Sequence, residues 1–317
     1  MERYYHVNGK RLEEQYAAYL SDFTTWDQAE HAEDYILFPK NIGPYLSIDE
    51  TSLSQGELYT ILTNKEAKSR KGSIVAIIKG TESEHVHSIL KQIPQYQRHK
   101  VKEVTLDMAH AMQRIVAASF PKATQVTDRF HVQKLAFEGV QELRIKYRWE
   151  AIEQENLEME LAKEAGKKYV PQRLENGDSP KQLLARSRYL LFKSQDKWTP
   201  KQIHRAQILF EKYPLLKEAY LLARKLAYIY QNVKDKGVAL TKLAKWYDEV
   251  EKSNISSFQT ISRSIQQNYL TILNFFERRS TNANAESFNA KIKAFRTQFR
   301  GVRNVKFFLY RLAKIYA

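Results

Sequence analysis

Two short stretches, each a strand pattern that ends on an aspartate, constrain the fold of this chain more than any other feature. In residues 104–106 apolar and polar side chains alternate, as in a half-buried strand, and Asp107 follows directly. Residues 124–127 repeat the form, Asp128 follows them, and His131 begins an apolar helical spacing. Carboxylates at the carboxyl ends of strands lie where α/β folds place ligands and metal ions. Each aspartate could instead cap the helix after it, and the pattern alone leaves both interpretations open.

The segments before these aspartates complete the pattern of a mixed sheet. Residues 45–48 form a strand pattern that ends on Asp49, and two more strand patterns follow at 58–63 and 74–79. A helical spacing at 83–93 then precedes the next strand. This order predicts three antiparallel strands extended by two parallel ones through helical crossovers. Such a five-stranded sheet matches the α/β ribonuclease H-like fold.

Composition indicates a folded protein with an anionic partner. The chain has 317 residues, a formal net charge of +15, 43% hydrophobic and 12% aromatic residues, and no cysteine. The positive surplus favours a polyanion, most often a nucleic acid. Without cysteine there are no disulfides and no thiolate zinc sites, as is usual inside cells. No apolar run approaches the length of about 18 residues that spans a membrane, so we expect a cytoplasmic protein without a membrane partner.

Charge and periodicity divide the chain into three parts. Residues 1–44 carry four basic against eight acidic side chains, with helical spacings at 12–20 and 26–36. From residue 132 to about 280 nearly every segment is helical in pattern. Because strand patterns do not return, we predict an all-α insertion at 132–280 within one domain formed by 45–131 and 281–317. The insertion holds a basic cluster that could follow a phosphate backbone or be a solvated surface: Lys181, Arg186, Arg188, Lys193, Lys197, Lys201 and Arg205.

The last segment combines one acid with many bases. Residues 281–317 contain eight basic side chains and a single acidic one, Glu286. A predicted core face is defined by apolar residues at helical spacing: Ala285, Phe288, Ile292, Phe295 and Phe299. Glu286 shares a neighbouring face with Asn289, Lys293 and Arg300. The glutamate could bind a ligand, or simply favour the helix dipole near the helix start.

Asp49, Asp107 and Glu286 are therefore three candidate ligands for a hard cation. Mg²⁺ takes oxygen ligands and typically only a few carboxylates, with water and substrate phosphate in its remaining positions. Two such ions about 4 Å apart stabilise both the attacking and the leaving oxygen of a phosphoryl transfer. Cations are then needed nearby to hold the nucleic acid strand, and residues 281–317 supply them.

The ordered motifs resemble those of DDE transposases of bacterial insertion sequences, of the ISL3 type. The resemblance runs from about Tyr45 to the C-terminus and rests on Ile48-Asp-Glu-Thr51, Leu106-Asp-Met108, Thr127-Asp-Arg-Phe-His-Val132, Asn284-Ala-Glu-Ser-Phe-Asn-Ala-Lys-Ile-Lys293, Arg296 and Gly301-Val-Arg-Asn304. In that family a ribonuclease H-like core carries a helical insertion before the final glutamate.

The resemblance implies roles for individual residues. Asp49, Asp107 and Glu286 would be the catalytic ligands of two Mg²⁺ ions, with Mn²⁺ as a possible substitute. Asp128 and His131 form an Asp-x-x-His pattern that lies near the active site in related transposases, and we give them a supporting role together with Asn289. The expected DNA contacts are Lys291, Lys293, Arg296, Arg300 and Arg303.

We therefore expect the catalytic subunit of a transposase, which cleaves DNA at element ends and transfers the strand to a target. The alternatives are a DNA-binding relic or regulator without turnover, and a structure-specific nuclease of the same fold. Family members usually begin with metal-binding and helix-turn-helix regions, and residues 1–44 have neither the cysteines nor the positive charge for them. We expect a homo-oligomer on DNA, associated with the nucleoid, and a separate DNA-binding subunit that recognises the ends.

Overall fold

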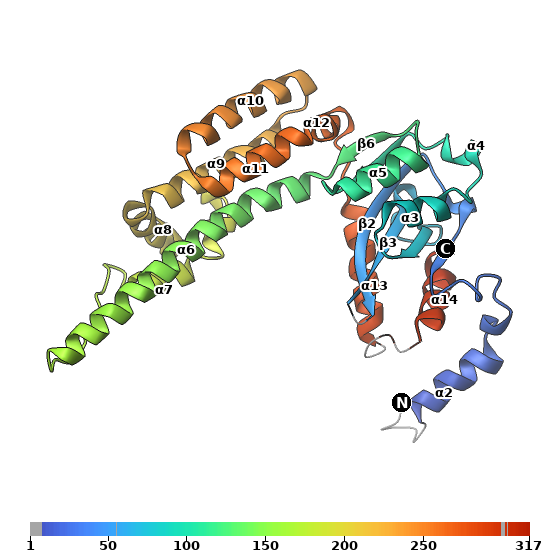
Figure 1. Cartoon of the computed structure of the whole chain (residues 1–317), viewed down its shortest axis with the longest axis horizontal. Helices are drawn as coiled ribbons and strands as arrows, with labels where there is room; N and C mark the ends of the chain where they lie inside the picture. The colour runs from blue at the N-terminus through green and yellow to red at the C-terminus, as the bar shows by residue number, and fades with distance from the viewer. Residues whose placement is uncertain (1–7, 55, 299–301, 303) are drawn as a thin grey trace. The chain divides into compact units, whose positions relative to one another are not determined.

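The computed structural model describes residues 8–54, 56–298, 302 and 304–317, and they fold into two compact units. The sheet unit contains the described residues up to Asp128 and those from Ser280 onward (Figure 1). The helical unit is Arg129–Arg279. The chain thus leaves the sheet unit once and returns to it once.

The sheet unit is built on a mixed sheet of six described strands, in the order β1-β4-β3-β2-β5-β6. Their bounds are β1 Tyr35–Leu37, β2 Tyr45–Ser54, β3 Glu57–Asn64, β4 Ile74–Lys79, β5 Glu103–Leu106 and β6 Thr124–Thr127. The pairs β1–β4, β4–β3 and β3–β2 are antiparallel, whereas β2–β5 and β5–β6 are parallel. The predicted mixture of antiparallel and parallel strands is confirmed, and the predicted number of five is wrong.

The additional strand, β1, lies where a helix was predicted. Instead of a helix at 26–36, the chain makes turns and then pairs Tyr35–Leu37 with β4 at the sheet edge. Main-chain bonds flank the pairing, from the Lys79 N–H to the Asp34 carbonyl at 2.7 Å and from the Phe38 N–H to the Val75 carbonyl at 2.8 Å. Because these partners are about 40 residues away, the local helical spacing gave no sign of them.

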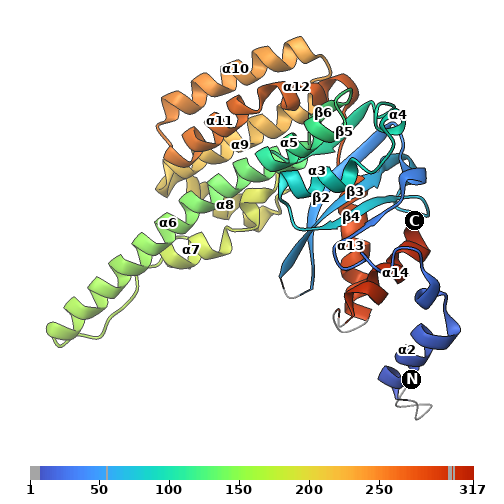
Figure 2. The ribbon, with the colours of Figure 1, turned by 45° about the vertical axis from the view of Figure 1, so that its right-hand side comes forward.

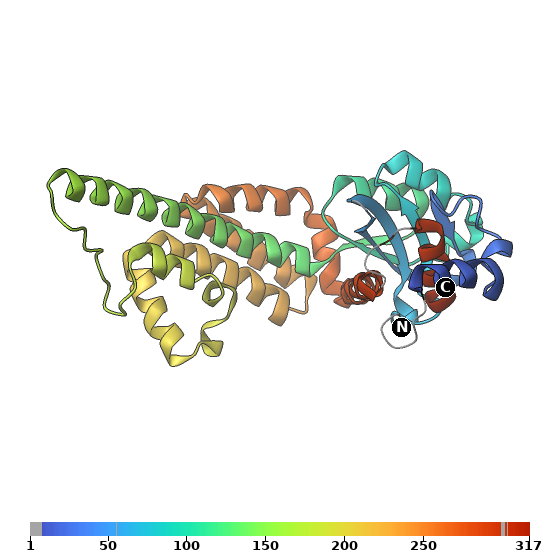
Figure 3. The ribbon, with the colours of Figure 1, turned by 90° about the horizontal axis from the view of Figure 1, so that it is seen from below.

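Helices cover both faces of the sheet (Figure 3). One face packs against α3 (Ser83–Leu90) and α5 (His110–Ser119) through a buried cluster that includes Ile48, Val104 and Val116, and the short α4 (Gln95–Arg98) follows α3 without a buried residue of its own. The other face packs against α13 (Ala283–Gln298) and α14 (Val305–Tyr316). Here the predicted core residues Phe288 and Ile292 are buried and Phe295 is half-buried, while Phe299 lies outside the described residues.

The described N-terminal segment is held on α14. It forms α2 (Gly9–Gln15), a π-helical turn (Tyr16–Leu20) and a 3-10 turn (Phe23–Thr25), so the predicted helical stretch at 12–20 is confirmed. Asp22 accepts hydrogen bonds from Tyr310 and Lys314, and the Phe23 ring lies 5.1 Å from that of Phe307. A further 3-10 turn, Pro39–Asn41, follows β1.

The helical unit is all α, as its sequence pattern indicates (Figure 2). Its helices are α6 Arg129–Glu164, α7 Pro180–Arg186, α8 Pro200–Lys212, α9 Pro214–Asn232, α10 Lys236–Ser253, α11 Ser256–Gln267 and α12 Tyr269–Arg278. Proline begins three of them, at a position where its missing N–H costs nothing. The α6 backbone approaches α11 closely at Gly139, where an added Cβ would lie 2.6 Å from Ile261 Cδ1. None of the described helices is both long and apolar enough to cross a membrane.

Candidate active site

Asp49, Asp107 and Asp128 form a row across three neighbouring strands of the sheet unit. The parallel register places Ser47 of β2 opposite Thr105 of β5, so Asp49 and Asp107 come next to each other two residues later. On the other side, β5 pairs Leu106 with Thr127, and the Asp128 N–H donates to the Leu106 carbonyl at 2.9 Å. Because alternate residues of a strand share a face, these carboxylates lie on the side that α13 covers.

The position of Asp49 corrects the sequence prediction. The residue does not end its strand: β2 continues to Ser54 as a hairpin with β3, and Asp49 pairs with Ile61. What ends two residues before Asp49 is the parallel pairing with β5. The carboxylate therefore still lies at the carboxyl edge of the parallel strands, where ligands bind in such sheets.

Negative charge accumulates around this row. Burial raises the pKa of the Glu50 carboxyl above its usual value, and the charges of Asp107 and then Asp49 raise it further. Glu50 therefore lies within electrostatic range of both aspartates. The sequence analysis did not identify Glu50 as a site residue. The only sequence feature that could have done so is its acidic side chain directly after Asp49. A site with this concentration of carboxylates is suited to a hard cation.

Helix α13 contributes Asn289 and Glu286 on one flank. The Asn289 side-chain amide donates to Asp49 Oδ2 at 2.6 Å. Glu286 lies one turn earlier on the same flank, exposed, and its N–H donates to the Asn282 carbonyl at 2.9 Å. Within the described part of the chain, no group of three or more His, Asp or Glu side chains is arranged to hold a metal ion. The structure thus brings Asp49 and Asp107 next to each other and joins Asn289 to Asp49, while Glu286 is exposed one turn earlier on α13.

The start of α13 is fixed to the sheet by polar contacts that the sequence did not reveal. Asp128 Oδ1 accepts the main-chain N–H of Asn282 at 3.3 Å, and Ser47 Oγ donates to Asn282 Oδ1 at 2.7 Å. His131, the other member of the Asp-x-x-His pattern, is half-buried in the first turn of α6 and belongs to the helical unit.

A buried ion pair lies close to the start of α13. Lys65 Nζ, at the end of β3, is 3.2 Å from Glu103 Oε1 and 2.7 Å from Thr105 Oγ1 on β5. The Asn284 side-chain amide donates to the Lys65 carbonyl at 3.0 Å. In the sequence Lys65 lies in a basic stretch between two strand patterns, which gives no sign of its partner Glu103.

The predicted DNA-binding cations of α13 have different surroundings. Lys291 donates to the Ser69 carbonyl at 2.6 Å, and Arg296 donates to the Ser52 carbonyl at 3.3 Å. Lys293 is exposed on the flank of Glu286 and Asn289. The two remaining candidates, Arg300 and Arg303, lie outside the described residues. Of the three described members of this set, Lys293 alone is exposed.

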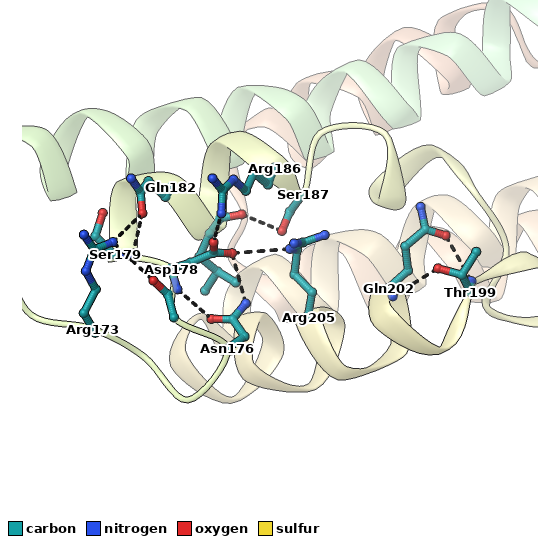
Figure 4. A network of polar contacts seen from close by, with 12 residues as sticks. Arg173, Asn176, Asp178, Ser179, Gln182, Arg186, Ser187, Thr199, Gln202 and Arg205 are labelled. Atoms are coloured by element: carbon teal, nitrogen blue, oxygen red, sulfur yellow. Dashed lines mark hydrogen bonds and ion pairs between the residues drawn. The ribbon is translucent and has the colours of Figure 1, made fainter.

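The basic cluster of the helical unit is partly neutralised. Asp178, only 1% exposed, binds Arg186 and, at 3.4 Å, Arg205 (Figure 4). Asn176 donates to the same carboxylate at 3.0 Å. These two arginines therefore stabilise the connection before α7. Three lysines of the cluster are exposed: Lys193, Lys197 and Lys201.

Comparison with known proteins agrees with the motifs. Residues 46–312 match the family described as transposase, of the DDE type named ISL3. The transposase of insertion sequence element IS1001 from Bordetella parapertussis is 22% identical over 271 residues, which are 84% of this chain and 60% of that protein. The Drosophila P element transposase in its strand transfer complex is 13% identical, with a TM-score of 0.37 over 91% of this chain and 80% of that one. Since the family match covers most of its length, the chain belongs to the ISL3-type DDE transposases.

Proposed function

We propose that this chain is the catalytic part of an insertion-sequence transposase, which cleaves DNA at the element ends and transfers the freed 3′ strand to a target. Membership of the transposase family supports this. The order β4-β3-β2-β5-β6, with three antiparallel strands followed by two parallel ones, supports a ribonuclease H-like core. The chain spans 60% of the length of its IS1001 relative, so the activity of the whole protein is part of the proposal.

The observation that carries the proposal is that Asp49 and Asp107 are neighbours across adjacent strands, with Glu50 within electrostatic range of both. Two neighbouring carboxylates fit Mg²⁺, which typically binds one or two carboxylates and takes its other ligands from water and phosphate. Asp49, Asp107 and Glu286 would hold two Mg²⁺ ions, for which Mn²⁺ could substitute. When bound, such ions activate the attacking oxygen and stabilise the leaving one.

The chain's own residues would orient the site and hold the DNA. Asn289 fixes the carboxylate of Asp49, which keeps its oxygens in one orientation. Lys293 lies on the same flank of α13, where its ammonium group can bind a phosphate of the scissile strand. Arg296, Arg300 and Arg303 would extend this contact along the strand.

We further propose the partners that this chemistry requires. They are DNA at the element ends and at the target, and at least a second copy of the chain, since two ends must be joined. Recognition of the ends is assigned to a separate DNA-binding subunit, because phosphate contacts by lysine and arginine carry no sequence information. Action on bacterial DNA would place the protein in the cytoplasm at the nucleoid.

Strand transfer with purified protein tests the proposal. Asp49→Asn, Asp107→Asn and Glu286→Gln each remove a ligand charge with little change of size, and each should abolish Mg²⁺-dependent joining. Glu66→Gln, an exposed glutamate on the β3–β4 loop, is the matched control and should act like the wild type. Near wild-type joining by one of the three variants would remove that residue from the site. Cleavage without joining by the wild type would indicate a nuclease, and DNA binding without cleavage a relic or regulator.

A further inference from the structure

Asp128 and Asn282 join the two points at which the chain leaves and re-enters the sheet unit. They are 154 positions apart in the sequence, and the Asp128 carboxylate accepts the Asn282 main-chain N–H. Asp128 is 1% exposed and Asn282 is 0% exposed, so water does not compete for this bond. The side chain of Asn282 is held in turn by Ser47 of β2, two residues before Asp49.

This contact determines where α13 begins. The Asn282 carbonyl accepts the N–H of Glu286, so Asn282 precedes the first turn of the helix. The negative charge of Asp128 at this point also favours the positive end of the helix dipole. Two residues after Asn282, Asn284 is bound to the β3–β4 loop, where its carbonyl accepts the Ser69 hydroxyl at 3.0 Å.

Glu286 therefore stands between two attachments of α13 to the same strand. The first is the hydrogen bond between Asn282 and Ser47, and the second is the hydrogen bond between Asn289 and Asp49. Asn282 and Asn289 are seven positions apart, which corresponds to about 10 Å along a helix. Because the helix between them is rigid, it cannot slide along the strand while both hydrogen bonds are present. With both attachments in place, the position of Glu286 relative to Asp49 is fixed by the sheet.

We propose that Asp128 is a positioning residue, which holds Asn282 and thereby sets the position of Glu286 relative to Asp49. This inference deepens the proposed function and rests on it. Asp128 stands in the same row as the two aspartates, so the competing assignment is a direct metal ligand. The two assignments differ in what they require: a ligand needs the negative charge, and the hydrogen bond to Asn282 needs only an acceptor oxygen.

Two substitutions at Asp128 separate these assignments. Asp128→Asn keeps an acceptor for the Asn282 N–H and removes the charge, whereas Asp128→Ala removes both. We expect Asp128→Ala to lower strand transfer about 10- to 100-fold, comparable to the loss when a group that orients a metal ligand is removed, and to raise the Mg²⁺ concentration required. Asp128→Asn should restore most of that loss. Ser47→Ala, which removes the hydrogen bond to the side chain of Asn282, should also lower strand transfer, but by a smaller factor.

Two measurements do not depend on activity. Hydrogen–deuterium exchange of the metal-free chain should show faster exchange at residues 282–290 in Asp128→Ala and Ser47→Ala, and unchanged exchange in Asp128→Asn. Calorimetric titration with Mn²⁺ should show binding by Asp128→Asn and its loss in Asp49→Asn. Asp196→Ala, an exposed carboxylate of the helical unit, is the control and should change neither measurement.

The outcomes distinguish this inference from the proposed function. Loss of Mn²⁺ binding in Asp128→Asn, as in Asp49→Asn, would make Asp128 a ligand and overturn the positioning role. Unchanged exchange at 282–290 in both Asp128→Ala and Ser47→Ala would overturn it as well. If the wild type neither joins DNA nor binds Mn²⁺, the proposed function fails, while the exchange experiment still decides whether Asp128 holds α13. If Asp128→Ala does not fold, Ser47→Ala provides the same comparison.

Discussion

The side chain of Asn289 donates a 2.6 Å hydrogen bond to Oδ2 of Asp49, across 240 positions of sequence. A helix near the end of the chain thereby orients a carboxylate near its beginning, in the strand that forms the centre of the sheet unit. The remaining oxygen, Oδ1, accepts the N–H of Glu50 at 2.9 Å. Both oxygens of Asp49 are thus fixed before any cation binds.

We expect Asn289→Ala to weaken Mn²⁺ binding and to lower strand transfer about 10- to 100-fold, because Asp49 can then rotate. The measurements are calorimetric titration and initial rates at several Mg²⁺ concentrations. Excess Mg²⁺ should restore part of the rate. Gln298→Ala, at the exposed end of the same helix, is the control. Equal Mn²⁺ affinity in Asn289→Ala and the wild type would show that Asp49 is oriented by other contacts.

Most of the sheet could be predicted from the sequence, because each of its longer strands carries a local signature. The buried runs at 58–63 and 74–79 correspond to β3 and β4, and the alternation before Asp107 corresponds to β5. Strand β1 could not be found in this way: it has three residues and exists through its pairing with β4. The length of β2 beyond Asp49 is likewise set by its hairpin partner β3.

The candidate site was only partly visible in the sequence. Asp49 and Asp107 follow apolar strand patterns, and this alone marks them as carboxylates at a sheet edge. The contacts of Asn282 and Lys65 depend on partners far away in sequence, so their residue types indicated nothing. Their positive charge made Arg186 and Lys291 candidates for phosphate contacts. In the structure Arg186 binds the buried Asp178, and Lys291 donates to the Ser69 carbonyl.

The buried pair of Lys65 and Glu103 predicts a strongly non-additive pair of mutations. Lys65→Met leaves the Glu103 carboxylate buried without its cation and should destabilise the chain by about 3–5 kcal/mol. Adding Glu103→Met removes the unpaired buried charge and should recover much of the lost stability. Urea unfolding of both variants measures the difference. Lys102→Met, an exposed neighbour, should stay within about 0.5 kcal/mol of the wild type. An additive result would mean that water reaches the pair.

The Asp178 network (Figure 4) predicts different costs for removing the central carboxylate and for removing its exposed partner Arg186. Asp178→Ala leaves Arg205 and Asn176 without their acceptor and should destabilise the helical unit by about 2 kcal/mol. Arg186→Ala removes a side chain that is 57% exposed, so its cost should stay below about 1 kcal/mol. Denaturant unfolding followed by tryptophan fluorescence measures both. Similar costs for the two variants would show that Arg186 is the main partner of Asp178.

The attachment of the N-terminal segment predicts a dependence on pH. Hydrogen bonds from Lys314 and Tyr310 lower the pKa of Asp22 from 3.8 to about 2. A carboxyl group with a lowered pKa stabilises the folded state above its unfolded pKa, and this contribution is lost as the pH falls from about 3.8 through about 2. The difference in unfolding free energy between wild type and Asp22→Asn should therefore shrink over that range. A parallel series with Asp27→Asn provides the comparison, and a constant difference for Asp22→Asn would contradict the attachment.

The distribution of cations predicts how the chain binds DNA. Phosphate contacts by lysine and arginine give affinity that falls steeply with salt and carry no sequence information. We expect the purified chain to bind duplex DNA with a preference for element ends far below the roughly thousandfold of a specific binder. Competition between end-repeat and scrambled duplex across roughly 50–200 mM salt measures this.

Two variants identify which cations take part. Lys293→Ala should reduce the slope of log affinity against log salt by about 1, since Lys293 is exposed beside the carboxylates. Arg186→Ala should leave the slope unchanged, because its guanidinium already binds Asp178. A lower slope for Arg186→Ala would place the helical unit on the DNA backbone through this arginine. A preference of about a thousandfold for the end sequence would show that the chain contains its own sequence reader. The separate DNA-binding subunit would then be unnecessary.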